Sequence, residues 1–382
     1  MNIRTINKKG YNLHIIKTKK FKTLVLKVIF WNELKKEELS LANLLIDNLL
    51  FSSYDYKTKR EFEIKKEDLY GIKVYGGPYI KGKNLITNYT LSCIEDKYTE
   101  KGNLLKAIEF FINCLTKPNV KDNKFDEETF NICKNQLLSA QIKEQENPGF
   151  IAHKKFREML GEKEIFSGSY LGTSKDTEKI TPESLYKYYK NLFKNNHIDI
   201  FIIGNVTDNI IKKIEEKLSL RENNIPYKKE RITYQKEYSE KVVESSFNQS
   251  IIKMGASLKD FSEEELHYNL PIYSMILGNS PSSKLFQNVR EKLSYAYFIS
   301  SNLYTSQGIL EINAGISSDN YESTKKEIIN QINEMKKGNF TEKEITNSKQ
   351  YILSTLKELP DSQMQIIDYY FNKLYFFKTS LE

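Results

Sequence analysis

Apolar residues follow two different spacings along the first 220 residues, and together they predict alternating strands and helices. Residues 22–32 and 197–206 are runs rich in β-forming side chains, so each predicts a strand. The glycine-rich stretch 70–96 predicts two or three further strands. Helical spacing of apolar positions predicts helices over residues 40–53, 99–118, 125–148 and 181–193, and a last helix that ends at about residue 218.

The same order of elements recurs after residues 219–241, a polar and charged stretch that contains a proline and predicts a linker. Beyond it, the pattern predicts a strand at 248–258, a helix at 262–280, a strand pair at 294–319, and helices at 321–338 and 340–360. Five residues of the last helix lie at one constant offset from five residues of helix 125–148. The pairs are Phe340 and Phe125, Glu342 and Glu127, Lys349 and Lys134, Leu353 and Leu138, and Ser354 and Ser139.

The repeat predicts an α+β chain of two tandem homologous domains, each a mainly antiparallel β-sheet with helices packed on one face. A length of 382 residues also favours two domains. We place the N-terminal domain at residues 1–222, the linker at 223–241 and the C-terminal domain at 242–382.

Composition and charge narrow the class of protein without indicating a function. The 58 basic and 50 acidic residues give a net charge of +8, and no arginine-rich cluster accompanies it, so we expect no nucleic-acid partner. Three cysteines (Cys93, Cys114 and Cys133) without a C-x-x-C unit favour a reducing compartment. The N-terminus lacks the apolar segment of a secretion signal, and no apolar run reaches the roughly 20 residues of a membrane span. We therefore expect a cytoplasmic protein with no membrane partner.

One polar pair stands out in the second half. The stretch LFQNVREKLSYAYFISS (residues 285–301) places Arg290 and Tyr297 where a predicted helix runs into a predicted strand. An ordinary structural role is one explanation, because the helix dipole favours arginine near a helix C-terminus and aromatic residues are common in strands.

The architecture and this stretch together resemble the M16 family of zinc peptidases, which includes insulinase and mitochondrial processing peptidase. The resemblance implies a LuxS/MPP-like metallohydrolase fold. It extends to FKTLVLKVIF, LYGIKVYGG with KGKN, and DIFIIGNV, and so covers nearly the whole chain. The LYG and KG pattern is most similar to a non-catalytic bacterial subgroup, the YfmF-type proteins, which are linked by name to modification of elongation factor P. The family pattern LFQ-x-x-REK-x-x-x-AY is matched at Leu285, Phe286, Gln287, Arg290, Glu291, Lys292, Ala296 and Tyr297.

The family's zinc ligands are missing from the matching helix. Catalysis in the family needs an H-x-x-E-H helix, in which two histidines bind zinc and the glutamate activates a water. The corresponding helix here reads LANLLIDNLLF, and its degenerate positions are Asn43, Ile46 and Asp47; the neighbouring register supplies no histidine either. We expect no metal, no other cofactor and no catalytic residue in this chain. No H-x-x-x-H pair exists among its four histidines, which are His14, His153, His197 and His267.

Three functions stay open at this point. In active relatives the second-half arginine and tyrosine face the zinc centre, and some bacterial relatives divide the two halves of the site between subunits. The resemblance thus implies a non-catalytic subunit that pairs with a zinc-bearing M16 homologue as a heterodimer and binds peptide or unfolded protein through Arg290 and Tyr297. The alternatives are a purely structural scaffold, connected with elongation factor P modification and without a peptide-binding cleft, and an active peptidase with scattered ligands such as Cys133, Asp47 and His153. Family chains also continue further, so we expect a truncated or abbreviated second domain.

Overall fold

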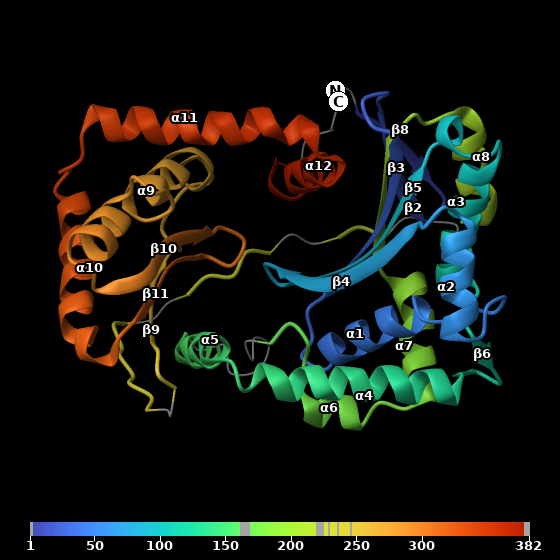
Figure 1. Ribbon diagram of the computed structural model, residues 1–382, viewed down its shortest axis with the longest axis horizontal. Helices are drawn as coiled ribbons and strands as arrows, with labels where there is room; N and C mark the ends of the chain where they lie inside the picture. The colour runs from blue at the N-terminus through green and yellow to red at the C-terminus, as the bar shows by residue number, and fades with distance from the viewer. Residues whose placement is uncertain are drawn as a thin grey trace. The chain divides into compact units, whose positions relative to one another are not determined.

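The structure is a computed structural model that describes residues 3–160, 169–218, 225–227, 230–234, 237–244 and 247–377 (Figure 1). It divides into two compact units, and neither is a single contiguous segment. The predicted domain boundary at residue 222 lies outside the described residues. The first unit contains Met1–Ile142, Tyr170–Lys229 and Leu359–Glu382, and the second contains Lys143–Ser169 and Glu230–Glu358.

A mixed sheet of six strands forms the centre of the first unit. The strands are β1 (Ile3–Lys8), β2 (Tyr11–Lys17), β3 (Thr23–Glu33), β4 (Lys73–Lys81), β5 (Asn84–Ile94) and β8 (His197–Gly204), in the spatial order β1-β2-β8-β3-β5-β4. Every neighbouring pair is antiparallel except β2 and β8, which run parallel. The predicted strands at 22–32 and 197–206 are confirmed as β3 and β8. A separate two-stranded ribbon joins β6 (Val120–Lys121) to β7 (Lys124–Phe125).

Helices cover one face of this sheet. Successive side chains of a strand point to opposite faces, so Phe30 of β3 faces these helices and lies 4.9 Å from the Phe193 ring. The helix α7 (Pro182–Asn195) begins as the sequence predicts. Thr181 accepts a hydrogen bond from the Ser184 backbone N–H, and Pro182 occupies the first turn. The helices of this unit are α1 (Glu38–Leu49), α2 (Lys59–Asp68), α3 (Asn103–Thr116), α4 (Glu127–Glu144), α6 (Ser174–Glu178), α7 (Pro182–Asn195) and α8 (Asp208–Lys217).

A helix from the C-terminal end of the chain covers the opposite face of the first sheet. This helix, α12 (Gln363–Phe377), buries Ile367 and Phe371 against Val25, Ile29 and Trp31 of β3. Figure 1 shows α12 and the group of α3 and α8 on opposite sides of the sheet. The sequence did not predict α12.

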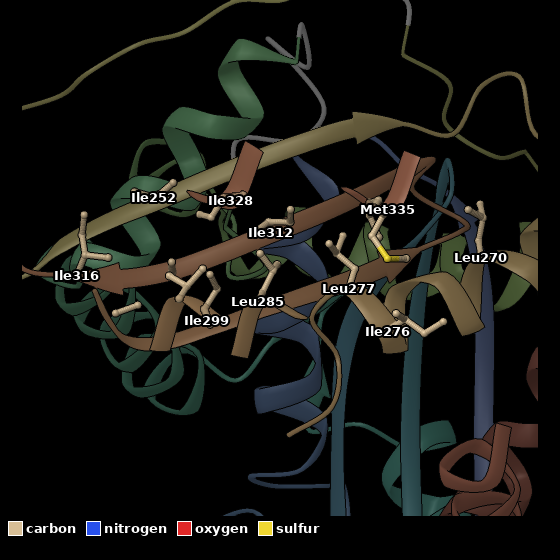
Figure 2. Packing of buried hydrophobic residues seen from close by; sticks show 14 of the residues in the cluster. Ile252, Leu270, Ile276, Leu277, Leu285, Ile299, Ile312, Ile316, Ile328 and Met335 are labelled. Carbon is tan, nitrogen blue, oxygen red and sulfur yellow. The ribbon is translucent and has the colours of Figure 1, made fainter. Parts of the chain in front are cut away.

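The second unit is built around a smaller antiparallel sheet in the order β10-β11-β9, from β9 (Ser250–Ser257), β10 (Ala296–Tyr304) and β11 (Ile309–Ile316). Figure 2 shows side chains of all three strands and of the covering helices gathered into one apolar layer, among them Ile252, Leu277, Ile299, Ile312 and Ile328. The covering helices are α9 (Leu270–Leu277), α10 (Tyr321–Lys336) and α11 (Glu342–Glu358), with two π-helices, η2 (Glu265–Asn269) and η3 (Phe286–Lys292).

The opposite face of the second sheet also carries one helix from a distant part of the chain, α5 (Pro148–Met159). Its Phe156 ring packs so closely on β9 that a Cβ added to Gly255 would lie 2.5 Å from the ring. Buried Arg157 donates to the Gln307 side-chain oxygen at 2.7 Å and lies 3.9 Å from the Glu311 carboxylate. The predicted α+β class is confirmed, and the two docked helices add cover on the second face of each sheet.

None of the described helices is both long enough and apolar enough to cross a bilayer.

Candidate functional site

The helix that carries the zinc ligands in active M16 peptidases corresponds to α1, and its degenerate positions now serve other contacts. The Asn43 side-chain amide donates to the Leu39 and Tyr170 carbonyls, both at 2.8 Å. Ile46 is buried in the core. The Asp47 side chain is exposed, but the protein around its carboxyl removes part of the water that would solvate the charge. This desolvation raises the pKa of the carboxyl to about 6, and the positive charge of Lys59 opposes the rise.

The chain segment that receives the Asn43 hydrogen bond lies across the first half of α1. Ser40 donates a side-chain hydrogen bond to the Thr173 carbonyl and accepts one from the Thr173 N–H. Gly172 has φ +82 and approaches so closely that a Cβ would lie 2.2 Å from the Ser40 hydroxyl. Hydrogen bonds and close backbone approach therefore hold this segment on α1, and the Asn43 amide is part of that contact.

The scattered residues considered as alternative zinc ligands form no metal-binding group in the described part of the chain. Cys133 on α4 is fully buried, and burial raises the pKa of its thiol to about 12, so the thiolate that binds zinc is disfavoured. Throughout the part of the chain that the structure describes, no three His, Cys, Asp or Glu side chains form a group that could hold a metal ion.

The two candidate substrate-binding residues lie on adjoining elements of the second unit. Arg290 is part of the π-helix η3, whose wider turns are seen in the hydrogen bond from the Leu293 N–H to the Asn288 carbonyl five residues earlier. Ser294, with φ +52, ends the turn, and β10 begins two residues later. Tyr297 lies on β10, which packs against η3.

Both side chains are exposed to solvent, and Arg290 makes only surface contacts. The Arg290 guanidinium is 42% exposed, lies 4.6 Å from the centre of the Phe286 ring and 3.7 Å from Glu291 Oε1. Tyr297 is 63% exposed. An accessible guanidinium offers several donors to a carbonyl or carboxylate, and π-helical segments occur often at functional sites. The arrangement can bind an acceptor group, and it contains no nucleophile or general base.

A buried polar cluster on the α12 face of the first sheet was missed by sequence reasoning. Oδ1 of Asp199 lies 3.0 Å from His14 Nε2 and 3.1 Å from His197 Nε2, and Oδ2 accepts a hydrogen bond from Trp31 Nε1 at 2.8 Å. We call these four residues the Asp199 cluster. Its sequence signal is the stretch HIDIFIIG, where His197 and Asp199 share one face of an otherwise apolar strand.

The electrostatics of the cluster favour a charged carboxylate. Burial acts to raise the pKa of the Asp199 carboxyl, but hydrogen bonds from His14 and His197 and the attraction of their charges outweigh it. The pKa therefore lies well below its ordinary value, and Asp199 is ionised although its side chain is almost completely buried.

The fold and the replaced ligand positions together define a metallopeptidase-like protein without the metallopeptidase's zinc ligands. Residues 179–352 match the family model described as the Peptidase M16 inactive domain. The chain is 24% identical over 374 residues to a "Probable inactive metalloprotease YmfF" of Bacillus subtilis, a match that covers 95% of this chain and 86% of that protein.

Solved structures share the same fold. A conserved protein from Enterococcus faecalis superposes with a TM-score of 0.85 at 24% identity, covering 98% of this chain and 89% of the other. A peptidase M16 inactive domain from Pseudomonas fluorescens superposes with a TM-score of 0.79 at 17% identity, covering 100% and 89%. The chain is thus similar over nearly its whole length to proteins named as inactive M16 peptidase homologues, and its sequence has no H-x-x-E-H motif for the family's zinc chemistry.

Proposed function

We propose that this chain is the non-catalytic subunit of a heteromeric M16 peptidase. It pairs with a zinc-bearing M16 homologue that supplies the H-x-x-E-H helix. Arg290 then binds a carbonyl or carboxylate of a peptide or unfolded protein, and Tyr297 donates a hydrogen bond to the oxyanion that develops during cleavage. The complex works in the cytoplasm, in keeping with three buried cysteines that form no disulfide.

The observation that carries the proposal is the contrast between the two halves of the family site. On α1, Asn43 is committed to backbone carbonyls and Ile46 is buried, so nothing at these positions resembles a zinc ligand. On η3 and β10, Arg290 and Tyr297 keep the residue types of the family pattern and keep exposed polar ends. A chain with only the second half of a site needs a partner for chemistry.

A scaffolding role without a peptide-binding cleft is the second candidate, and one observation favours it. Arg290 already stacks on Phe286 and lies near Glu291, contacts that are common for an arginine on a protein surface. In this reading the chain holds a partner protein, including one connected with elongation factor P modification, and Arg290 is dispensable.

Co-purification with a zinc-bearing M16 protein, followed by peptide hydrolysis assays of the complex, separates the two candidates. We expect Arg290→Ala to lower kcat/KM about 100-fold, because a hydrogen bond to a charged group is worth roughly 1.5–3 kcal/mol. Tyr297→Phe removes only the hydroxyl and is expected to lower kcat about tenfold or more.

Matched controls lie in the same unit. Lys292→Ala changes a charge on the same π-helix, and Tyr268→Phe removes a hydroxyl from a tyrosine that is 61% exposed. Both should stay within about twofold of the wild type. A complex that forms but cleaves peptides equally well with Arg290→Ala refutes the shared site and supports the scaffold, whereas failure to associate with any zinc-bearing M16 protein refutes the pairing.

A further inference from the structure

The strand that carries Tyr297 contains one residue more than the strand beside it. Ala296 of β10 pairs with Ile316 of β11. The next pair is Phe298 with Gly315, so two steps along β10 match one step along β11. The extra residue, Tyr297, makes a β-bulge. Bulges bend a strand and change the direction of a side chain, and they are frequent beside functional sites.

The burial of the neighbouring residues shows what the bulge does. Ala296 and Ile299 both belong to the apolar core between the second sheet and its helices, where Figure 2 shows Ile299. In a regular strand, residues three positions apart point to opposite faces, so the extra residue is what allows both to point into the core. Without the bulge, Tyr297 would lie on the same face as Ile299 and point into the core. With the bulge, Tyr297 is 63% exposed.

A close contact on the opposite face of the sheet holds the bulge in place. Gly315 lies between two core residues of β11, so it faces away from the helices, as its pair partner Phe298 does. A Cβ added to Gly315 would lie 2.2 Å from the Phe298 ring and 2.7 Å from the Gln249 side chain. The ring therefore lies directly on the glycine backbone, and a larger residue at this position would push it away.

Arg290 is joined to the bulge by a turn with defined hydrogen bonds. The Ser294 N–H donates to the Arg290 carbonyl at 3.1 Å, and the Tyr295 N–H donates to the Val289 carbonyl at 2.9 Å. Ser294 has φ +52, a backbone conformation that is uncommon for residues other than glycine. The chain between Arg290 and Tyr297 is therefore short and constrained, so the bulge sets the direction of Tyr297.

We propose that this bulge positions the candidate substrate site, with Phe298 and Gly315 as positioning residues that keep Tyr297 turned out of the core. The inference rests on the role of Tyr297 in the proposed function, and it adds two residues that the family pattern does not contain. Phe298 and Gly315 touch no substrate and act through Tyr297 alone. A one-residue change in the pairing of β10 would turn the tyrosine into the core, so the site depends on the strand register as well as on the hydroxyl.

Nitration by tetranitromethane, measured by mass spectrometry on the full chain without a partner, tests the direction of Tyr297. Tyr268 is 61% exposed and serves as the internal reference. Deletion of Ala296 removes the extra residue, so Tyr297 should take its place opposite Ile316 and point into the core. Nitration of Tyr297 relative to Tyr268 should then fall about tenfold. Unaltered nitration of Tyr297 in a folded deletion variant overturns the role of the bulge.

Gly315→Ala tests the contact with Phe298 and does not require the deletion variant to fold. The added Cβ must displace the ring, so we expect amide hydrogen exchange at Tyr297 and Phe298 to become about tenfold faster. Gly255→Ala is the matched control, because it adds a Cβ against the Phe156 ring on the same face of the same sheet. It should leave this exchange within about twofold of the wild type. Equal exchange in the wild type and Gly315→Ala refutes Phe298 and Gly315 as positioning residues.

Peptide hydrolysis by the complex with the zinc-bearing homologue separates the positioning role from the proposed function. Gly315→Ala should lower kcat about tenfold and leave KM within about twofold, because the hydroxyl acts in the transition state. Combined with Tyr297→Phe it should cause no further loss, since both changes remove the same interaction. A further loss in the double variant refutes the positioning role. If Tyr297→Phe alone leaves kcat unchanged, the proposed function fails and the bulge has no site to position, whereas unaltered nitration refutes the bulge alone.

Discussion

Two helices, α12 and α5, each cover the second face of a sheet built from a distant part of the chain, but different chemistries hold them. On the first sheet, the Trp31 ring lies 4.8 Å from Phe371 and 5.7 Å from Tyr375. Gln363 and Asp368 of α12 add polar contacts at the side of this apolar cluster, among them an ion pair with Lys27. On the second sheet, α5 inserts the buried Arg157, whose guanidinium donates to Gln307 and lies near Glu311.

The difference bears on what each unit can tolerate. Apolar burial is not directional, so the α12 contact should weaken in proportion to the volume removed. A buried ion pair gains little net stability, but removing one partner leaves the other charge buried and unpaired. Lys253 also lies 2.5 Å from Glu311, so the second unit concentrates three charges under one helix. We expect α12 to be sensitive to size and α5 to be sensitive to charge.

The largest effect should come from the apolar side of the comparison. Phe371→Ala removes a ring that is 2% exposed and packs on both Trp31 and Phe201. The lost burial and the cavity together should lower the free energy of unfolding of the first unit by about 4 kcal/mol in urea titrations. Tyr369→Ala, on an exposed position of the same helix, is the control and should change it by less than about 0.5 kcal/mol. Equal losses in the two variants would contradict the packing of α12 on the sheet.

The stability of the α5 contact with the second sheet should depend on charge. Arg157→Met keeps much of the side-chain length but leaves Glu311 with Lys253 as its remaining cation and leaves Gln307 without this donor. We expect a loss of about 3 kcal/mol in the unfolding free energy of the second unit. Lys155→Met on the same helix breaks only an exposed pair with Glu158 and should cost under about 1 kcal/mol. If Arg157→Met proves neutral, the charge-sensitive docking of α5 is wrong.

A glycine test measures how closely α5 approaches its sheet. Gly255→Ala places a Cβ 2.5 Å from the Phe156 ring and 2.8 Å from Ile309, so both side chains or the strand itself must shift. Overpacking of this kind costs about 1–3 kcal/mol, and Phe156→Leu in the same chain should recover part of it. Gly77→Ala on β4 is the matched control, because nothing lies within 4 Å of the added atom. No difference in thermal unfolding between the two alanine variants would show that α5 does not rest on β9.

The sequence was informative where the signal is local. β3 and β8 follow from runs of β-forming residues, and α7 begins at Thr181 and Pro182 because a cap and a fixed φ act within one turn. The absence of an H-x-x-E-H motif is read directly from the sequence, because its four histidines are too far apart to form one.

The docked helices and the buried clusters could not be predicted in this way. Phe371 contacts Trp31, and Phe156 lies close to Gly255, although each pair is far apart in sequence. The residues next to either partner in the sequence do not indicate which distant residue it will contact. The π-helical form of η3 likewise depends on tertiary contacts rather than on residue propensity. Arg290 and Tyr297 were selected by their family pattern, and their role in binding stays a prediction until the complex is assayed.

The smallest expected effect comes from a half-buried histidine of the second unit, His153. Burial, with the charges of Arg157 and Lys253, lowers the pKa of His153 on α5 to about 4, although Glu311 opposes the shift. A histidine kept neutral in the folded state contributes stability above its unfolded pKa of about 6.5, and that contribution is lost as the pH falls towards 4. The second unit should therefore become less stable as the pH falls from about 6.5 towards 4. Unfolding midpoints measured between pH 7 and pH 4 should fall less steeply in His153→Gln than in the wild type, whereas an unchanged slope would show that His153 is not held neutral by the charges beneath α5.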